Sequence, residues 1–385
     1  MDFDLPAEHE ELRRAVRQLC DGFPGTYWRG LEPDRYPEEF VTALAEQGYL
    51  GALIPERFGG GGATLSAASV ILEEVCASGA NAAACHAQMY IMGTLLRHGT
   101  EEQQARYLPE IAAGRLRLQA FGVTEPDAGS ETHRIRTRAE RIPGGYRITG
   151  HKIWTSRAAH SDLMLLLART TPLEEVQRRT DGMSVFLIDL RTAGDRVTIE
   201  PIATMMNHST TQVFIDGLEV GDDALVGEEG AGFRAIVDGM NAERILIAGE
   251  CVGDGRFFLD RASAYARERV VFGRPIGANQ GVQFPLARAH AAVEAASLVR
   301  FKAAWLYDQG RPCGAEANMA KLLASEASWA AANACLDTHG GFGFAREYDV
   351  ERKFRETRLY QVAPVANNLV LAHIGQHVLG LPKSY

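Results

Sequence analysis

The period of the hydrophobic pattern changes twice along this chain, and this change constrains the fold more than any other feature. Up to about residue 117, apolar residues such as Leu12, Val16 and Leu19 recur at helical spacing. The segment 118–227 consists of short runs rich in β-branched and aromatic residues, separated by turn residues. Long helical patterns return after it. The sequence therefore predicts an α+β fold with three domains, helical over 1–117, β over 118–227 and helical over 228–385.

Individual elements can be predicted inside these segments. The strands are expected at 146–149, 163–167, 184–190, 197–201 and 212–215. The long helices are expected at 233–269, 284–309, 315–336 and 367–378. Pro143, Gly144 and Gly145 predict a hairpin turn before the first of these strands. The glycine run 59–62 predicts a loop, because glycine costs about 1 kcal/mol per residue in a helix relative to alanine.

Composition and charge exclude several classes of function. A chain of 385 residues with 46% hydrophobic residues can bury a large core and a deep pocket. Its formal net charge of -9 argues against a nucleic-acid or anionic-membrane partner, because phosphate-bearing polymers and lipids repel an acidic surface. No apolar run approaches the roughly 20 residues of a membrane span. The acidic stretch Met1–Glu11 has no apolar core and is not expected to be a signal peptide, so we expect a cytoplasmic protein.

The cysteine pattern predicts neither a disulfide framework nor a metal site. The six cysteines lie far apart, without a CxxC pair and without a histidine at metal-ligand spacing beside them. We therefore expect buried free thiols and no metal.

Six motifs give the chain a family resemblance. They are PERFGGGG (Pro55–Gly62), HGTEEQQARYLPEIAAG (His98–Gly114), FGVTEPDAGSE (Phe121–Glu131), GHKIWTS (Gly150–Ser156), ERVVFGRPIGANQGVQF (Glu268–Phe284) and HGGFGF (His339–Phe344). In this order and spacing the chain resembles the acyl-CoA dehydrogenase family. The resemblance implies an N-terminal helical domain, a middle β-barrel or sandwich domain and a C-terminal four-helix bundle. It also implies FAD as cofactor, an electron-transfer flavoprotein as electron acceptor and a homotetramer built as a dimer of dimers.

The third and fourth motifs suit a flavin ring. A flat ring with polar edges needs an aromatic or apolar face and hydrogen-bond donors around it. Trp154 can supply the face, and the hydroxyls of Thr124 and Ser156 can supply the donors. By resemblance, the flavin-contacting set is Phe121, Val123, Thr124, Gly129, Ser130, Trp154 and Ser156.

The last two motifs suit the rest of the cofactor. Arg269 and Phe272 resemble the family segment that reaches across a dimer interface to the FAD pyrophosphate of the neighbouring subunit. Arginine fits this role because its planar guanidinium binds two phosphate oxygens at once. By resemblance, Gln280 and Gln283 lie near the adenosine half, and Gly340 and Gly341 let the backbone pass close to the cofactor.

The catalytic base departs from the usual family pattern. Dehydrogenation requires a carboxylate that removes the α-proton while the β-hydride moves to the flavin. Most members carry a late glutamate, but that position is Pro364 here, which has neither a carboxylate nor a backbone N–H. A second family arrangement places the base on an earlier helix just before an arginine, and Glu243 and Arg244 match it. Glu250, on the same helical face, is the competitor.

Glu243 could also be an ordinary surface glutamate, since Glu-Arg pairs are common on solvated helix faces. The resemblance places Ser130 and Arg244 on the substrate side. The leading function is dehydrogenation of an acyl-CoA, or of an acyl group on a carrier protein. The alternatives are an enoyl-CoA reductase or a flavin oxidase or oxygenase of the same fold, and a non-catalytic member that binds acyl thioesters. Acyl chain length, branching and reaction direction cannot be read from the sequence.

Overall fold

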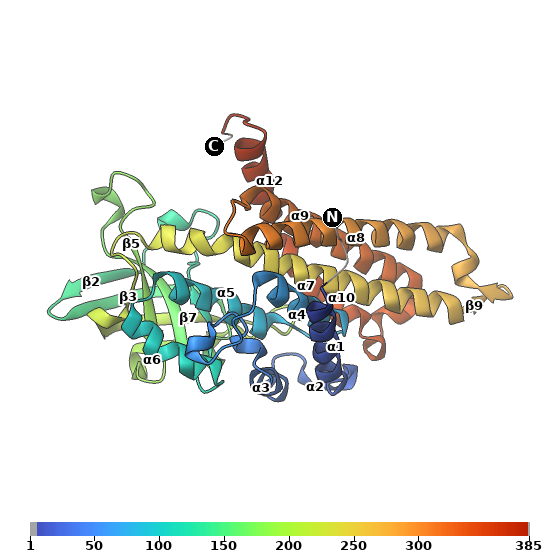
Figure 1. Ribbon diagram of the computed structural model, residues 1–385, viewed down its shortest axis with the longest axis horizontal. Coiled ribbons are helices and arrows are strands. Elements are labelled where there is room, and N and C mark those ends of the chain that lie inside the picture. Colours follow the sequence, from blue (N-terminus) through green and yellow to red (C-terminus); the bar gives the residue numbers. More distant parts are fainter. Residues whose placement is uncertain (1–5, 384–385) are drawn as a thin grey trace. The chain divides into compact units, whose positions relative to one another are not determined.

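The computed structural model describes residues 6–383, and the chain folds into two compact units (Figure 1). We call them the helical unit and the mixed unit. The helical unit takes its described residues from 1–32, 64–82 and 241–385, and the mixed unit comprises 33–63 and 83–240. Neither unit is continuous in sequence, and the boundary at residue 241 falls inside one long helix, α7 (Gly232–Glu268).

The mixed unit is built on one sheet of eight strands. Seven strands have the order β6-β7-β3-β2-β4-β5-β8, and β1 pairs with β4. Their bounds are β1 Leu118–Gly122, β2 Arg138–Ile142, β3 Gly145–Ser156, β4 Leu163–Arg169, β5 Met183–Asp189, β6 Val197–Pro201, β7 Thr210–Gly221 and β8 Leu225–Val226. The helices of this unit are α3 Glu38–Glu46, α5 Ala83–His98 and α6 Glu101–Ala112.

Alternation along β4 explains why the sheet is buried on both faces. Every residue of β4 is buried. Leu163, Leu165 and Leu167 join a core with residues of α5 and α6, whereas Met164 and Leu166 join a second core with residues of β3 and β7. A strand covered on both faces reads as a continuous apolar run, which is the pattern of this segment.

The helical unit consists of α1 Ala7–Asp21, α2 Gly25–Leu31, α4 Leu65–Ala77, the later part of α7, α8 Gln280–Asp308, α9 Gly314–His339, α10 Val350–Thr357, α11 Leu359–Val362 and α12 Asn367–His373. Between α7 and α8 lies a hairpin of β9 Val270–Val271 and β10 Arg274–Pro275, at the far end of both helices (Figure 1). Close helix packing depends on small residues. A Cβ at Gly253 of α7 would lie 2.1 Å from the carbonyl oxygen of Glu73 of α4.

The predicted fold class is confirmed. The predicted strands and long helices all appear, although the last helix keeps its α geometry only to His373 before a π-helical turn. The predicted hairpin joins β2 to β3, where Ile142 pairs with Gly145 and Gly144 takes a φ of 80° that suits glycine. The six cysteines are free and buried. Among residues 6–383, no helix is long and apolar enough to cross a membrane.

Candidate active site

The first part of the predicted cofactor site is a loop that follows β1 in the mixed unit. Glu125 and Ala128 exchange backbone hydrogen bonds of 3.1 and 3.0 Å, so the chain turns tightly between them. The backbone N–H of Ile153 on β3 donates to the carbonyl oxygen of Thr124 at 2.9 Å. This bond joins the loop to the strand that carries Trp154 and Ser156. The fold therefore brings the two predicted flavin motifs together.

A buried ion pair between Lys152 and Glu125 holds this loop against β3. Lys152, fully buried on β3, donates to the carboxylate of Glu125 at 2.8 Å and to the carbonyl oxygen of Val123 at 3.0 Å. Burial lowers the pKa of Lys152 to about 8, although the carboxylate opposes the shift. Glu125 also accepts the backbone N–H groups of Arg136 and Thr137, at 2.6 and 2.9 Å. The pair thus holds Thr124 at a defined place beside β3.

Trp154 lies at the surface of the mixed unit. Its side chain is 57% exposed and its backbone has a φ of 59°, a left-handed conformation that is uncommon for a bulky residue. A tryptophan that only filled the core would be buried, so this indole presents an open aromatic face. Gly129 and Ser130 are exposed on the loop, and Phe121 and Val123 are partly buried next to the core.

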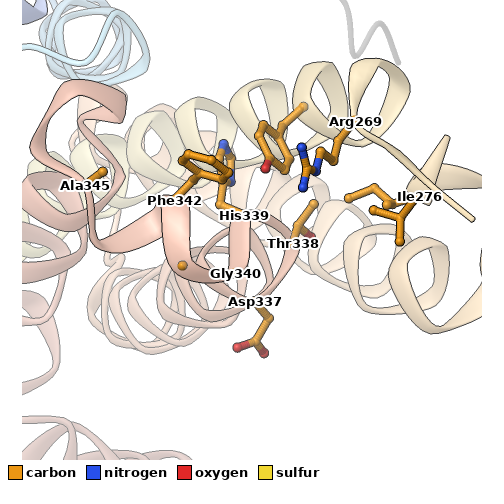
Figure 2. Close-up of a pocket in the computed structure, with 11 residues that line it drawn as sticks. Arg269, Ile276, Asp337, Thr338, His339, Gly340, Phe342 and Ala345 are labelled. Carbon is orange, nitrogen blue, oxygen red and sulfur yellow. The ribbon is translucent and has the colours of Figure 1, made fainter.

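The second part of the predicted site is a pocket of about 570 Å³ in the helical unit (Figure 2). Three predicted cofactor residues, Arg269, Gly340 and Gly341, line it. Its remaining wall residues are Tyr265, Val271, Ile276, Asp337, Thr338, His339, Phe342 and Ala345. Figure 2 shows the Arg269 side chain on the same side as the aromatic rings and the Asp337 carboxylate turned away from it. The guanidinium lies 5.8 Å from the Phe342 ring centroid.

This pocket fits a phosphate-bearing cofactor. Arg269 supplies a guanidinium that suits phosphate oxygens. Gly340 has a φ of 57°, and a Cβ built on Gly340 or on Gly341 would meet nothing within 4 Å. The backbone there is therefore open to a ligand. The aromatic rings of Tyr265 and Phe342 supply an apolar wall for an adenosine.

The other predicted cofactor residues of this region do not line the pocket. Phe272 is at the tip of the β9–β10 hairpin with 102% relative exposure and a φ of 51°. Gln280 and Gln283 are exposed in the first turn of α8, where the amide of Gln283 donates to the carbonyl oxygen of Gly277 at 2.7 Å. Val270 and Val271 of β9 are exposed next to Phe272, and a group of exposed apolar side chains is a surface that a partner would cover.

The predicted base is buried rather than solvated. Glu243 on α7 is 4% exposed, so the interpretation as a surface glutamate is wrong. Burial lowers the pKa of the adjacent Arg244, while the charge of Glu243 opposes that shift. Glu250 is buried too. The pKa of Tyr360 is raised mainly by the burial of Tyr360 and next by the charge of Glu250. The two carboxylates therefore have different surroundings on one helix.

Comparisons with known proteins agree with this arrangement. Residues 6–115, 120–218 and 230–379 match the family models for the N-terminal, middle and C-terminal domains of acyl-CoA dehydrogenase. The chain belongs to the acyl-CoA dehydrogenase family. An acyl-CoA dehydrogenase of Mycobacterium tuberculosis is 38% identical over 98% of this chain and 97% of its own length.

One further relative and one solved structure are also similar to this chain. A 3-(aryl)acrylate reductase of Clostridium sporogenes is 30% identical over 95% of this chain and 97% of its own length. The solved complex of a glutaryl-coenzyme A dehydrogenase with glutaryl-CoA superimposes with a TM-score of 0.92 at 30% identity, covering 100% of this chain and 98% of that one. Acyl-CoA dehydrogenases are oxidoreductases and FAD-binding flavoproteins, in agreement with the predicted enzyme class and cofactor.

Sequence reasoning missed buried charges that hold parts of this chain together. Lys152 stands inside the GHKIWTS motif, but the polar residues around it gave no local signal for its burial. Lys321 on α9 is fully buried as well, in an alanine- and serine-rich helix. No motif pointed to it, because its partners lie more than forty residues further along the chain.

Proposed function

We propose that this protein is an FAD-dependent dehydrogenase of an acyl thioester, carried on CoA or on a carrier protein, with the trans-2-enoyl thioester as product. The buried Glu243 carries the proposal. A carboxylate taken out of water at the position matched by resemblance suits a general base, because burial keeps competing water away from its oxygens. Pro364, at the usual late position, cannot accept a proton.

The chemistry divides between the cofactor and the chain. Bound FAD supplies a hydride acceptor for the β-hydrogen of the acyl group. Glu243 accepts the α-proton, and the thioester oxygen needs donors while negative charge builds on it. Pro364 has no N–H to offer, so we assign that donor to the backbone N–H of Val365. Arg244 and Ser130 complete the proposed substrate side.

The cofactor contacts are part of the same proposal. In the mixed unit we assign the flavin ring to Phe121, Val123, Thr124, Gly129, Ser130, Trp154 and Ser156. In the helical unit we assign the pyrophosphate and adenosine to Arg269, Phe272, Gln280, Gln283, Gly340 and Gly341. The open indole of Trp154 and the Arg269 pocket support these assignments.

A substitution at Glu243 tests the base. Glu243→Gln keeps the shape and polarity of the side chain but cannot accept the α-proton. We expect this variant to bind FAD and to lose flavin bleaching by acyl-CoA, by a factor of at least about 100 in rate. Stopped-flow absorbance of the flavin measures this rate across a ladder of acyl-CoA substrates.

Glu250→Gln is the matched control. It makes the same change on the same helix face, two turns away, and we expect it to keep substrate-dependent bleaching. Bleaching at the wild-type rate in Glu243→Gln would refute Glu243 as the base. Loss of bleaching only in Glu250→Gln would identify Glu250 as the base instead.

The partners are proposed on the same basis. Electron-transfer flavoprotein is the proposed acceptor, and a homotetramer built from two dimers is the proposed assembly. The family membership and the exposed Phe272 support these partners. A cytoplasmic location suits six buried free thiols, which persist best in a reducing compartment.

Reduction of a conjugated double bond is the second candidate. The relative from Clostridium sporogenes, named as a 3-(aryl)acrylate reductase, favours it. The same residues would serve in reverse, since a base for one direction is an acid for the other. Oxidation of the reduced flavin, followed with an enoyl-CoA and separately with oxygen, distinguishes the candidates. A reductase consumes the enoyl-CoA, an oxidase reacts fast with oxygen, and a dehydrogenase with bound product is protected from oxygen.

A further inference from the structure

We propose that Lys321 is a positioning residue for the reaction: its contacts with Val365 and Asn367 hold the segment around Pro364, and its buried positive charge acts on Glu243. The inference deepens the proposed function, since it rests on Glu243 as the base. Lys321 belongs to α9 and Glu243 to α7, both within the helical unit.

The contacts of Lys321 tie two elements together. Its ammonium donates to the carbonyl oxygen of Val365 and to the side-chain oxygen of Asn367, each at 2.7 Å. The Asn367 amide also donates to the hydroxyl of Ser325 at 3.1 Å, one turn further along α9. The segment between α11 and α12 is therefore anchored at a backbone atom and at a side chain. The N–H that we assign to the thioester oxygen belongs to the same residue, Val365, so the held carbonyl limits its movement across the Cα atom.

A comparison with other buried lysines shows what is unusual about Lys321. Lys152, Lys321 and Lys353 are all at most 1% exposed. Lys152 forms an ion pair with Glu125, and Lys353 forms ion pairs with Asp254 and Glu356. Within residues 6–383, Lys321 forms no ion pair with a carboxylate and has only neutral oxygen partners. A buried cation bound only by neutral groups has an unbalanced charge, which acts on any carboxylate nearby.

Two carboxylates, Glu243 of α7 and Glu326 of α9, act on the charge of Lys321, and of these Glu243 is buried whereas Glu326 is exposed to screening by water. Arg244 and Cys251 of α7 act on Lys321 as well, and His373 of α12 faces Arg244 in turn. Burial, the largest cause, lowers the pKa of Lys321 to about 8, which leaves the amine mostly protonated at neutral pH. A buried cation that acts on Glu243 favours the ionised carboxylate, and this is the form that accepts the α-proton.

Three variants separate the charge from the anchor. Lys321→Met removes both, Lys321→Arg keeps the charge but changes the geometry, and Ser325→Ala weakens the anchor without touching the charge. The measurement is the pH profile of kcat/KM per bound flavin, with kcat and KM read separately. In Lys321→Met, we expect the fall of kcat/KM on the acid side of the profile, the acid limb, to begin about one pH unit higher than in the wild type. We also expect kcat to be lower by about tenfold or more. We expect Lys321→Arg and Ser325→Ala to keep the wild-type limb with a reduced kcat.

Each outcome bears on the proposal. A Lys321→Met enzyme with a lower melting temperature but a wild-type acid limb and kcat per flavin would overturn it. If that variant does not fold, Lys321→Gln, which keeps a donor without the charge, must show the same upward shift. Failure of the underlying function is distinguishable, because Glu243→Gln would then still bleach. If Glu243→Gln is inactive and the Lys321 profiles stay wild-type, only the positioning role fails.

Discussion

At the scale of single residues, two neighbouring glycines of the Arg269 pocket have different constraints. Gly340 has a φ of 57° and a ψ of -132°, a region that side-chain-bearing residues rarely adopt, whereas Gly341 has no positive φ. Neither position is crowded. We expect Gly340→Ala to lower the free energy of unfolding by about 1–3 kcal/mol through backbone strain alone. Urea unfolding of the apoprotein measures this loss.

Gly341→Ala is the control for crowding without strain. It adds the same methyl group next door, and we expect its unfolding free energy to stay within about 0.5 kcal/mol of wild type. FAD fluorescence titration adds a second readout, since strain at Gly340 should also weaken cofactor binding. Equal losses in both variants would contradict the backbone explanation.

At the scale of elements, one buried carboxylate holds several helices together. Glu73 of α4 is fully buried and forms ion pairs with Arg300 of α8 at 2.5 Å, with Arg13 of α1 at 3.1 Å and with Arg256 of α7. Burial alone would raise the pKa of Glu73, but the three guanidinium groups lower it overall. Glu73→Gln leaves the buried Arg300 without its counter-charge, and we expect it to cost about 3–5 kcal/mol.

The pH dependence of this network has a definite sign. The folded pKa of Glu73 lies below its usual value of 4.5, so its stabilising contribution is complete above that pH and is lost as the pH falls through the folded pKa. Urea unfolding from pH 3 to pH 7 should therefore show a shallower acid loss for Glu73→Gln. Glu74→Gln is the matched control, because the neighbouring buried Glu74 pairs with the largely exposed Arg17 and, at 3.6 Å, with Arg13, but not with the fully buried Arg300, and should matter less. An unchanged acid slope in Glu73→Gln would contradict this role.

These elements also show what the sequence could predict. The strand 163–167 and the helix 233–269 were predictable because their apolar patterns are long and local. That α4 belongs with α7 and α8 was not, because pairing of distant segments depends on packing and leaves no local pattern. In the site, the resemblance predicted that the segments of Thr124 and Trp154 belong to one binding site, and the structure brings these two segments together. The burial of Glu243 and Lys321 was hidden, since both stand in patterns that also occur on solvated helix faces.

At the scale of the whole molecule, the hairpin between α7 and α8 predicts an assembly. Val270, Val271 and Phe272 are all exposed apolar residues, and Phe284 at the start of α8 is 53% exposed. A contiguous apolar surface on a folded chain marks a protein interface. The acidic balance of the chain gives no basis for a nucleic-acid or anionic-membrane partner there. A second copy of the chain is the partner that the family resemblance proposes.

Phe272→Asp tests this assembly. A charge at the hairpin tip would have to be buried without a partner at the subunit interface, which costs several kcal/mol per site. We expect the variant to lose mass by light scattering and to release FAD more easily, because Arg269, directly before β9 and three residues before Phe272, would lose its place beside the neighbouring cofactor. Met205→Asp, an equal change at a 60% exposed residue of the mixed unit, should keep the wild-type mass and flavin content. If Phe272→Asp leaves the mass and the FAD affinity unchanged, the hairpin is not part of the interface. Arg269 would then serve only the pocket of its own chain.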